Sequence, residues 1–180
     1  MKIVERKFYD GSEQRIKRLG LSCLIEEAEE LLKKCQVTLA EEKNANGGAA
    51  LRRLLDEHFK KSKEWIKVSS GGIDWTKCRT VGETRICIGI EIQVSARSNL
   101  VIRDVIHLRD ELENGKIDVG VIVVPSDRMA HYLPSRAPTW RETVQVIHDA
   151  RATHMPLLLI GIEHDGPGVA LPKDKDKRDR

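Results

Sequence analysis

Apolar residues at helical spacing dominate the first third of the chain. From Leu21 to Cys35 they recur every three or four positions with acidic residues between them, which predicts an amphipathic helix. The breaker cluster EEKNANGG follows, and a second helix is predicted from about Ala49 to about Trp65. Residues 1–66 are therefore expected to be mostly helical.

Between residues 70 and 94 the pattern changes to alternation, which predicts two paired strands. Gly82 and Glu83 form the candidate loop between them, because glycine in the first position of a two-residue loop fits a type II′ turn. In that register Asp74 lies directly opposite Glu91. The large apolar residues then share one face of the hairpin: Ile73, Trp75, Ile86, Ile88, Ile90, Ile92 and Val94.

The other face of the predicted hairpin is polar and carries Asp74, Thr76, Gly89, Glu91 and Gln93. Opposed β-carbons on adjacent strands are about 4.5–5.5 Å apart, so two carboxylates there repel unless a cation lies between them or one is protonated. Magnesium resolves the conflict, because proteins bind it through one or two carboxylates, and Gly89 leaves room over this face. The alternative is a solvated sheet face on which the two acids align by coincidence.

After the hairpin, helical and buried-strand patterns alternate. A helix is predicted from about Ser98 to Asn114, and the apolar run from Ile117 to Pro125 predicts a buried strand. A capping-box pattern at Thr139–Glu142 opens a further helix to about Thr153, and residues 156–162 predict a last buried strand. This order predicts an α/β fold with a mixed central sheet and a hairpin flanked by helices.

Length and charge favour one domain of modest net charge. The 180 residues suffice for a single core, and we expect one domain over residues 1–166, with a helical part (1–66) and a core (67–166). Residues 167–180 form a polar tail that is expected to be disordered. The tail from Pro172 holds +2 of the net charge of +3, so any phosphate-binding surface must be a local patch.

No segment resembles a membrane span or a signal peptide, so the cytoplasm is the expected compartment. The four cysteines lack zinc spacing. The hairpin register places Cys78 opposite Cys87, which permits a cross-strand disulfide, but the compartment favours reduced thiols. Five of the six histidines have no metal spacing with one another and are interpreted as surface residues: His58, His107, His131, His148 and His154. Glu163-His164-Asp165 follows a buried strand, where ligand groups often lie, although polar residues are common there.

The hairpin resembles the PD-(D/E)XK nuclease core, in which an Asp on one strand is followed by Glu-x-Lys on the next. Here the motif is Ile73-Asp74 and Glu91-Ile92-Gln93. Gln in the place of Lys is similar to the BglII-like type II restriction endonucleases, relatives of the BamHI-like enzymes, which cut sites built on a central GATC. The segments EIQVSARSNL, KIDVGVIVVPSDRMAHYLPSRAPTW and MPLLLIGIEHDG resemble that family's later segments, so the resemblance covers roughly residues 65–166. The Asp-to-Glu spacing of seventeen is longer than in the family pattern.

The resemblance implies a restriction-endonuclease-like core and Mg²⁺-dependent hydrolysis of double-stranded DNA that leaves 5′-phosphates. Asp74 and Glu91 would hold Mg²⁺ together with the backbone carbonyl of Ile92. Gln93 cannot act as a base and would orient water through hydrogen bonds, leaving solvent or a phosphate oxygen as the proton acceptor.

DNA contacts are expected from two loops. The residues concerned are Arg97, Ser98 and Asn99 in the first loop, and Ser135, Arg136 and Thr139 in the second. Helix capping is the alternative for Ser98 and Thr139. Cutting at a palindrome requires a two-fold homodimer, for which Leu100–Leu112 is a candidate interface helix unless its apolar stripe is buried in the core.

Two further functions remain open. One is a nuclease with the same core that acts in repair or on DNA junctions. The other is a non-catalytic DNA-binding protein with a degenerate nuclease fold, which the missing Lys favours.

Overall fold

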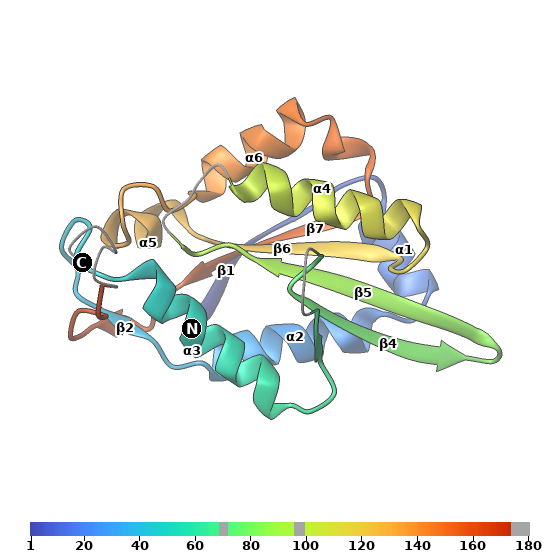
Figure 1. Cartoon of the computed structure of the whole chain (residues 1–180), viewed down its shortest axis with the longest axis horizontal. Helices are drawn as coiled ribbons and strands as arrows, with labels where there is room; N and C mark the ends of the chain where they lie inside the picture. The colour runs from blue at the N-terminus through green and yellow to red at the C-terminus, as the bar shows by residue number, and fades with distance from the viewer. Residues whose placement is uncertain (69–71, 96–99, 174–180) are drawn as a thin grey trace, which may run out of the picture.

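A six-stranded mixed sheet forms the middle layer of the protein, in the order β1-β7-β6-β5-β4-β3 (Figure 1). The computed structural model describes residues 1–68, 72–95 and 100–173. The strands of the sheet are β1 (Lys2–Phe8), β3 (Ile66–Lys67), β4 (Trp75–Val81), β5 (Thr84–Ile92), β6 (Val119–Pro125) and β7 (Leu157–Glu163). Strands β5, β6 and β7 are parallel, and β1, β4 and β3 run antiparallel to their neighbours. The predicted α/β fold with a mixed sheet is confirmed.

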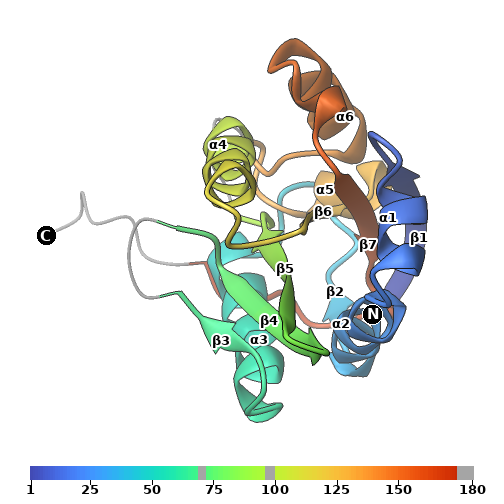
Figure 2. The ribbon, with the colours of Figure 1, turned by 90° about the vertical axis from the view of Figure 1, so that its right-hand side faces the viewer.

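Helices cover both faces of the sheet (Figure 2). The helices are α1 (Ser12–Arg18), α2 (Ser22–Lys34), α3 (Gly48–Lys61), α4 (Leu100–Glu113), α5 (Asp127–Tyr132) and α6 (Trp140–Asp149), with a 3₁₀ turn at Ala152–His154. One core packs α2 and α3 against the sheet, and the other core packs α4 and α6 against its opposite face. Because apolar side chains meet helices on both sides, β6 and β7 are buried along their whole length.

The predicted hairpin register is confirmed. Trp75 pairs with Ile90 and Cys78 pairs with Cys87, and Gly82 takes the positive φ of 61° that a type II′ turn requires. The predicted faces are correct except for Ile73. This residue precedes β4 and packs in the core under α4, where its Cδ1 would lie 2.7 Å from a β-carbon at Gly89. The room predicted over Gly89 is therefore filled by apolar side chains.

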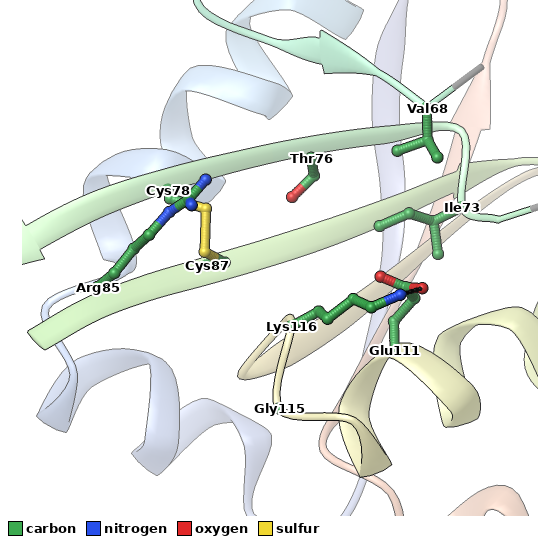
Figure 3. A pocket seen from close by; sticks show the side chains of 9 residues that line it. All are labelled: Val68, Ile73, Thr76, Cys78, Arg85, Cys87, Glu111, Gly115 and Lys116. Carbon is green, nitrogen blue, oxygen red and sulfur yellow. Dashed lines mark hydrogen bonds and ion pairs between the residues drawn. A yellow bond between two sulfur atoms is a disulfide. The ribbon is translucent and has the colours of Figure 1, made fainter.

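A disulfide joins Cys78 to Cys87, so the prediction that both thiols are reduced is wrong for this structure. The pair lies where the hairpin leaves the sheet, because β5 pairs with β6 only from Ile88 onward. Figure 3 shows this bond in the wall of a pocket of about 340 Å³, with Arg85 and Lys116 nearby. Beyond the bond the two arms of the hairpin pair only with each other among the described residues.

Two predictions about the ends of the chain need correction. The segment Lys2–Phe8 is a strand, not a helix, because it adds an antiparallel edge to β7. The predicted tail is ordered at least to residue 173: β8 (Gly166–Pro167) pairs with β2 (Thr38–Leu39), and Leu171 donates its N–H to Asn46. Residues 174–180 lie outside the described residues.

No helix in the described part of the chain has both the length and the apolar character that a bilayer crossing requires.

Phe59 holds α3 against the hairpin and gives a test of this packing. Its buried ring stacks on Trp75 at 5.5 Å and meets Trp65 edge-on at 5.3 Å. Phe59→Ala is expected to lower the free energy of unfolding by about 3–5 kcal/mol, measured by urea denaturation. The exposed neighbour Lys60→Ala is the control, with an expected change of about 0.5 kcal/mol or less. Equal stability of the two variants would contradict the packing.

Candidate metal-dependent active site

The two carboxylates that the register predicts to be opposed do meet, at the carboxyl end of β5. Glu91 is 3% exposed, and its carboxyl group shares a hydrogen bond with that of Asp74. The second oxygen of Asp74 also accepts the backbone N–H of Ile92 at 2.8 Å. A solvated sheet face is therefore excluded, because Glu91 is buried and the side chain of Asp74 is only 21% exposed.

Arg52 of α3 supplies the cation beside the pair. Its Nη2 lies 2.5 Å from Oδ1 of Asp74, and its Nη1 donates to the carbonyl oxygen of Ile92. Its Nε lies 3.2 Å from Asp56, one turn further along α3. The N-terminal third of the chain thus contributes a charged group to a site that the sequence places entirely on the hairpin.

Helix α4 closes the site from the other side with two more ionisable groups. His107 Nδ1 lies 3.0 Å from Oε1 of Glu91. Asp104 is 7% exposed and belongs with Glu91 and His107 to a group whose ligand atoms all lie within 4.8 Å of one another. The interpretation of His107 as a surface residue is wrong, because its side chain faces the carboxylates.

The site holds more negative than positive charge. Burial, followed by the charges of Asp74 and Asp104, raises the pKa of Glu91 to about 11. Burial and Asp74 raise the pKa of Asp104 to about 7. Burial also opposes ionisation of Asp74, but the hydrogen bond and charge of Arg52 outweigh it and hold that pKa below its usual value. In this state Asp74 is the ionised member of the pair and Glu91 keeps its proton.

Gln93 connects the strand to α4. Its Nε2 donates to Asp104 at 3.2 Å, and its Oε1 accepts from the Ser95 hydroxyl at 2.8 Å. Gln93 is 5% exposed, so both ends of the amide are engaged inside the protein. A water-orienting role for Gln93 stays a prediction, and the contacts seen are those of a residue that positions Asp104.

The predicted DNA-binding residues fall into two groups. Arg97, Ser98 and Asn99 lie outside the described residues. Ser135 and Arg136 are exposed on the loop between α5 and α6, beyond the carboxyl end of β6. Thr139 caps α6, accepting the N–H of Glu142 at 3.1 Å, so the capping alternative describes its side chain here. Contact between these residues and DNA remains a prediction.

The Glu163-His164-Asp165 segment forms structural contacts at the end of β7. His164 is 2% exposed and lies between Glu163 and Glu41, at 2.9 Å from the latter. Glu163 accepts the hydroxyl of Ser126, and Asp165 accepts the N–H of Val37 at 2.8 Å.

The donor set fits a hard divalent cation. Carboxylate and carbonyl oxygens are the ligands that Mg²⁺ prefers, and imidazole suits other divalent metals. Burial is the main cause of the raised pKa of Glu91, and the negative charges of Asp74 and Asp104 add to it; a bound cation would oppose both effects, because it favours the ionised carboxylate. Asp74, Glu91 and the Ile92 carbonyl could hold the ion, as could the Glu91, Asp104 and His107 group.

A model of a known protein family matches most of the chain. The family model described as restriction endonuclease BglII/BglIII matches residues 8–162 of this chain. No curated protein sequence matches the chain.

The raised pKa of Glu91 predicts how the metal-free protein responds to pH. The folded state binds this proton up to about pH 11, and the unfolded state releases it near pH 4.3. The stabilising contribution is therefore complete below pH 4.3 and is lost as the pH rises, by at most about 1.4 kcal/mol per pH unit. Glu91→Gln is expected to unfold with a flatter pH dependence and to exceed the wild-type stability at pH 9, measured by urea denaturation in EDTA.

The exposed turn residue Glu83 provides the matched control for this measurement. Glu83→Gln should follow the wild-type curve between pH 6 and pH 9. If Glu91→Gln also followed it, Glu91 would be ionised in the folded protein and the charge assignment would be wrong.

Proposed function

The chain belongs to the BglII/BglIII restriction endonuclease family and is a type II site-specific deoxyribonuclease, and from this premise we propose that it cuts double-stranded DNA with Mg²⁺ at a palindrome centred on GATC. The observation that carries the proposal is the contact between buried Glu91 and partly buried Asp74, a pair that has too little positive charge and lies at the carboxyl edge of the parallel strands. Members of this family use divalent metals, and the oxygen donors here suit Mg²⁺.

The chemistry proposed is hydrolysis of one phosphodiester bond in each strand. A bound Mg²⁺ would stabilise charge on the scissile phosphate and favour ionisation of a water. Asp74 and Glu91 would hold the ion from the two arms of the hairpin, both as carboxylates. The water gives a proton to solvent or to a phosphate oxygen and forms the new bond to phosphorus. The bond from phosphorus to the 3′-oxygen breaks, and that oxygen takes a proton from solvent, which leaves a 3′-hydroxyl and a 5′-phosphate.

The residues on α4 set the geometry of the carboxylates. His107 contacts one oxygen of Glu91, and Gln93 fixes Asp104 at the same end of the helix. These contacts restrict the rotamers of Glu91 and so favour one ligand position. The missing Lys of the motif does not leave the site without a cation, because Arg52 provides one from α3.

Sequence readout is assigned to the loops after β5 and α5. Arg136 is exposed and suits a bidentate contact with guanine. Arg97, Ser98 and Asn99 are proposed to contact DNA from the loop after β5, as expected from the sequence. Ser135 and Thr139 are assigned to the same DNA-binding surface. Because the side chain of Thr139 caps α6, Thr139 would contact the DNA backbone through its own main chain and the start of that helix.

Plasmid digestion tests the proposed reaction. Wild-type protein with Mg²⁺ should give discrete, reproducible fragments, and sequencing of the ends should show 5′-phosphates at a GATC-centred site. Glu91→Ala should lose at least about 100-fold in rate while DNA binding persists in a Ca²⁺ gel-shift assay. The exposed Glu113→Ala serves as the control and should cut like wild type. Unchanged cutting by Glu91→Ala would refute the site, and random fragments would refute sequence specificity.

A homodimer is proposed through α4. The stripe residues Val101, Val105 and Leu108 are buried in the core, but Ile102 and Ile106 are 40% and 42% exposed, one turn apart on the outer side of the helix. Two copies of such a face bury each other's apolar surface.

Ile106→Glu tests the dimer, because it places a charge in the proposed interface. Light scattering after gel filtration should give twice the mass of one chain for wild type and the mass of one chain for the variant. Val4→Glu, which changes an equally exposed residue on β1, should remain dimeric. A dimer that survives Ile106→Glu but not Val4→Glu would move the interface to β1.

A further inference from the structure

Arg52 binds two oxygen atoms that are proposed ligands of the metal ion. Its Nη2 is 2.5 Å from Oδ1 of Asp74, and its Nη1 donates to the carbonyl oxygen of Ile92. The other oxygen of Asp74 accepts the N–H of Ile92 at 2.8 Å. Two of the three proposed ligands are therefore already satisfied by donors of the protein itself.

A guanidinium in this position and a metal ion on the same atoms exclude each other. Magnesium approaches its oxygen ligands to about 2.0–2.1 Å, and a cationic nitrogen at hydrogen-bond distance from the same oxygens fills that space. The two positive charges also repel each other strongly at such separations away from water. Arg52 must leave Asp74 and Ile92 before an ion binds both.

The fold provides a place for Arg52 to stay after it leaves. Its Nε is 3.2 Å from Oδ1 of Asp56, a residue on the same helix whose position is fixed by a 3.0 Å hydrogen bond from Trp75 Nε1. Asp56 keeps the guanidinium close to the site when Asp74 is given to the metal. The released N–H groups are then available to a phosphate oxygen.

We propose that Arg52 is a displaceable counter-ion that gates the metal site: it neutralises Asp74 in the metal-free enzyme, and a divalent cation enters by displacing it onto Asp56 and a DNA phosphate. This inference rests on the proposed metal-dependent function. Arg52, on helix α3, is therefore a positioning residue. It acts on the ion through the oxygens of Asp74 and Ile92, which both the guanidinium and the ion would bind.

Calorimetric titration with Ca²⁺, without DNA, tests the gate independently of cleavage. Arg52→Gln should bind Ca²⁺ about tenfold or more tightly than wild type, because no charged hydrogen bonds need to be broken first. Lys67→Gln is the matched control: Lys67 also pairs with Asp56, at 2.8 Å, but contacts neither Asp74 nor Ile92. It removes the same charge beside the site and should change the affinity about twofold or less, as for a screened surface charge.

The possible results are distinct. Equal Ca²⁺ affinities for wild type and Arg52→Gln would overturn the gate but not the metal site. The gate would also be overturned if Lys67→Gln gained as much Ca²⁺ affinity as Arg52→Gln, because the effect would then be one of net charge. Failure of both wild type and Arg52→Gln to bind Ca²⁺ or Mn²⁺ overturns the metal assignment and the gate together.

Phenylglyoxal footprinting of wild-type protein keeps the proposal testable if Arg52→Gln does not fold. Peptide mass spectrometry should show Arg52 protected in EDTA and modified several-fold faster in saturating Ca²⁺, because its donors are released from Asp74. Arg128, whose side chain is 62% exposed, should react at the same rate in both conditions. Continued protection of Arg52 in Ca²⁺ would show that the ion binds without displacing it.

Discussion

The opposition of Asp74 and Glu91 across a hairpin is the constraint on which the rest of the site depends. Two buried carboxyl groups in hydrogen-bond contact cannot both ionise without a cation. The metal-free protein resolves this in two ways at once: Glu91 keeps a proton, and Arg52 neutralises Asp74. Because Arg52 comes from α3, the helix must pack firmly on the hairpin, which explains the aromatic contacts of Phe59.

The hairpin could be predicted from sequence because its information is local. Alternation and one glycine determined the register, and the register alone placed Asp74 opposite Glu91. The cap of α6 was equally predictable, since Thr139 and Glu142 are three residues apart. For such features the residues in contact are close along the chain, so spacing is sufficient.

The rest of the site depends on how distant helices dock, which no local pattern specifies. Arg52 is forty residues from Ile92, and its spacing to Asp56 is that of any surface ion pair on a helix. Asp104 and His107 are next to residues of the apolar stripe of α4, but the sequence does not show that their side of the helix faces β5. Strand β1 was missed for a similar reason: its partner β7 lies at the other end of the sequence, and its mainly exposed edge carries charged residues.

The position of the Cys78–Cys87 bond restricts how far the hairpin can open. The arms beyond it project from the sheet with no other strand to support them, so the turn at Gly82 is the part most subject to fraying. The bond crosses the hairpin just where that projection begins. The covalent link at the base of the projecting arms therefore limits how far an opening of the turn can separate the two strands of the hairpin on their way to Asp74 and Glu91.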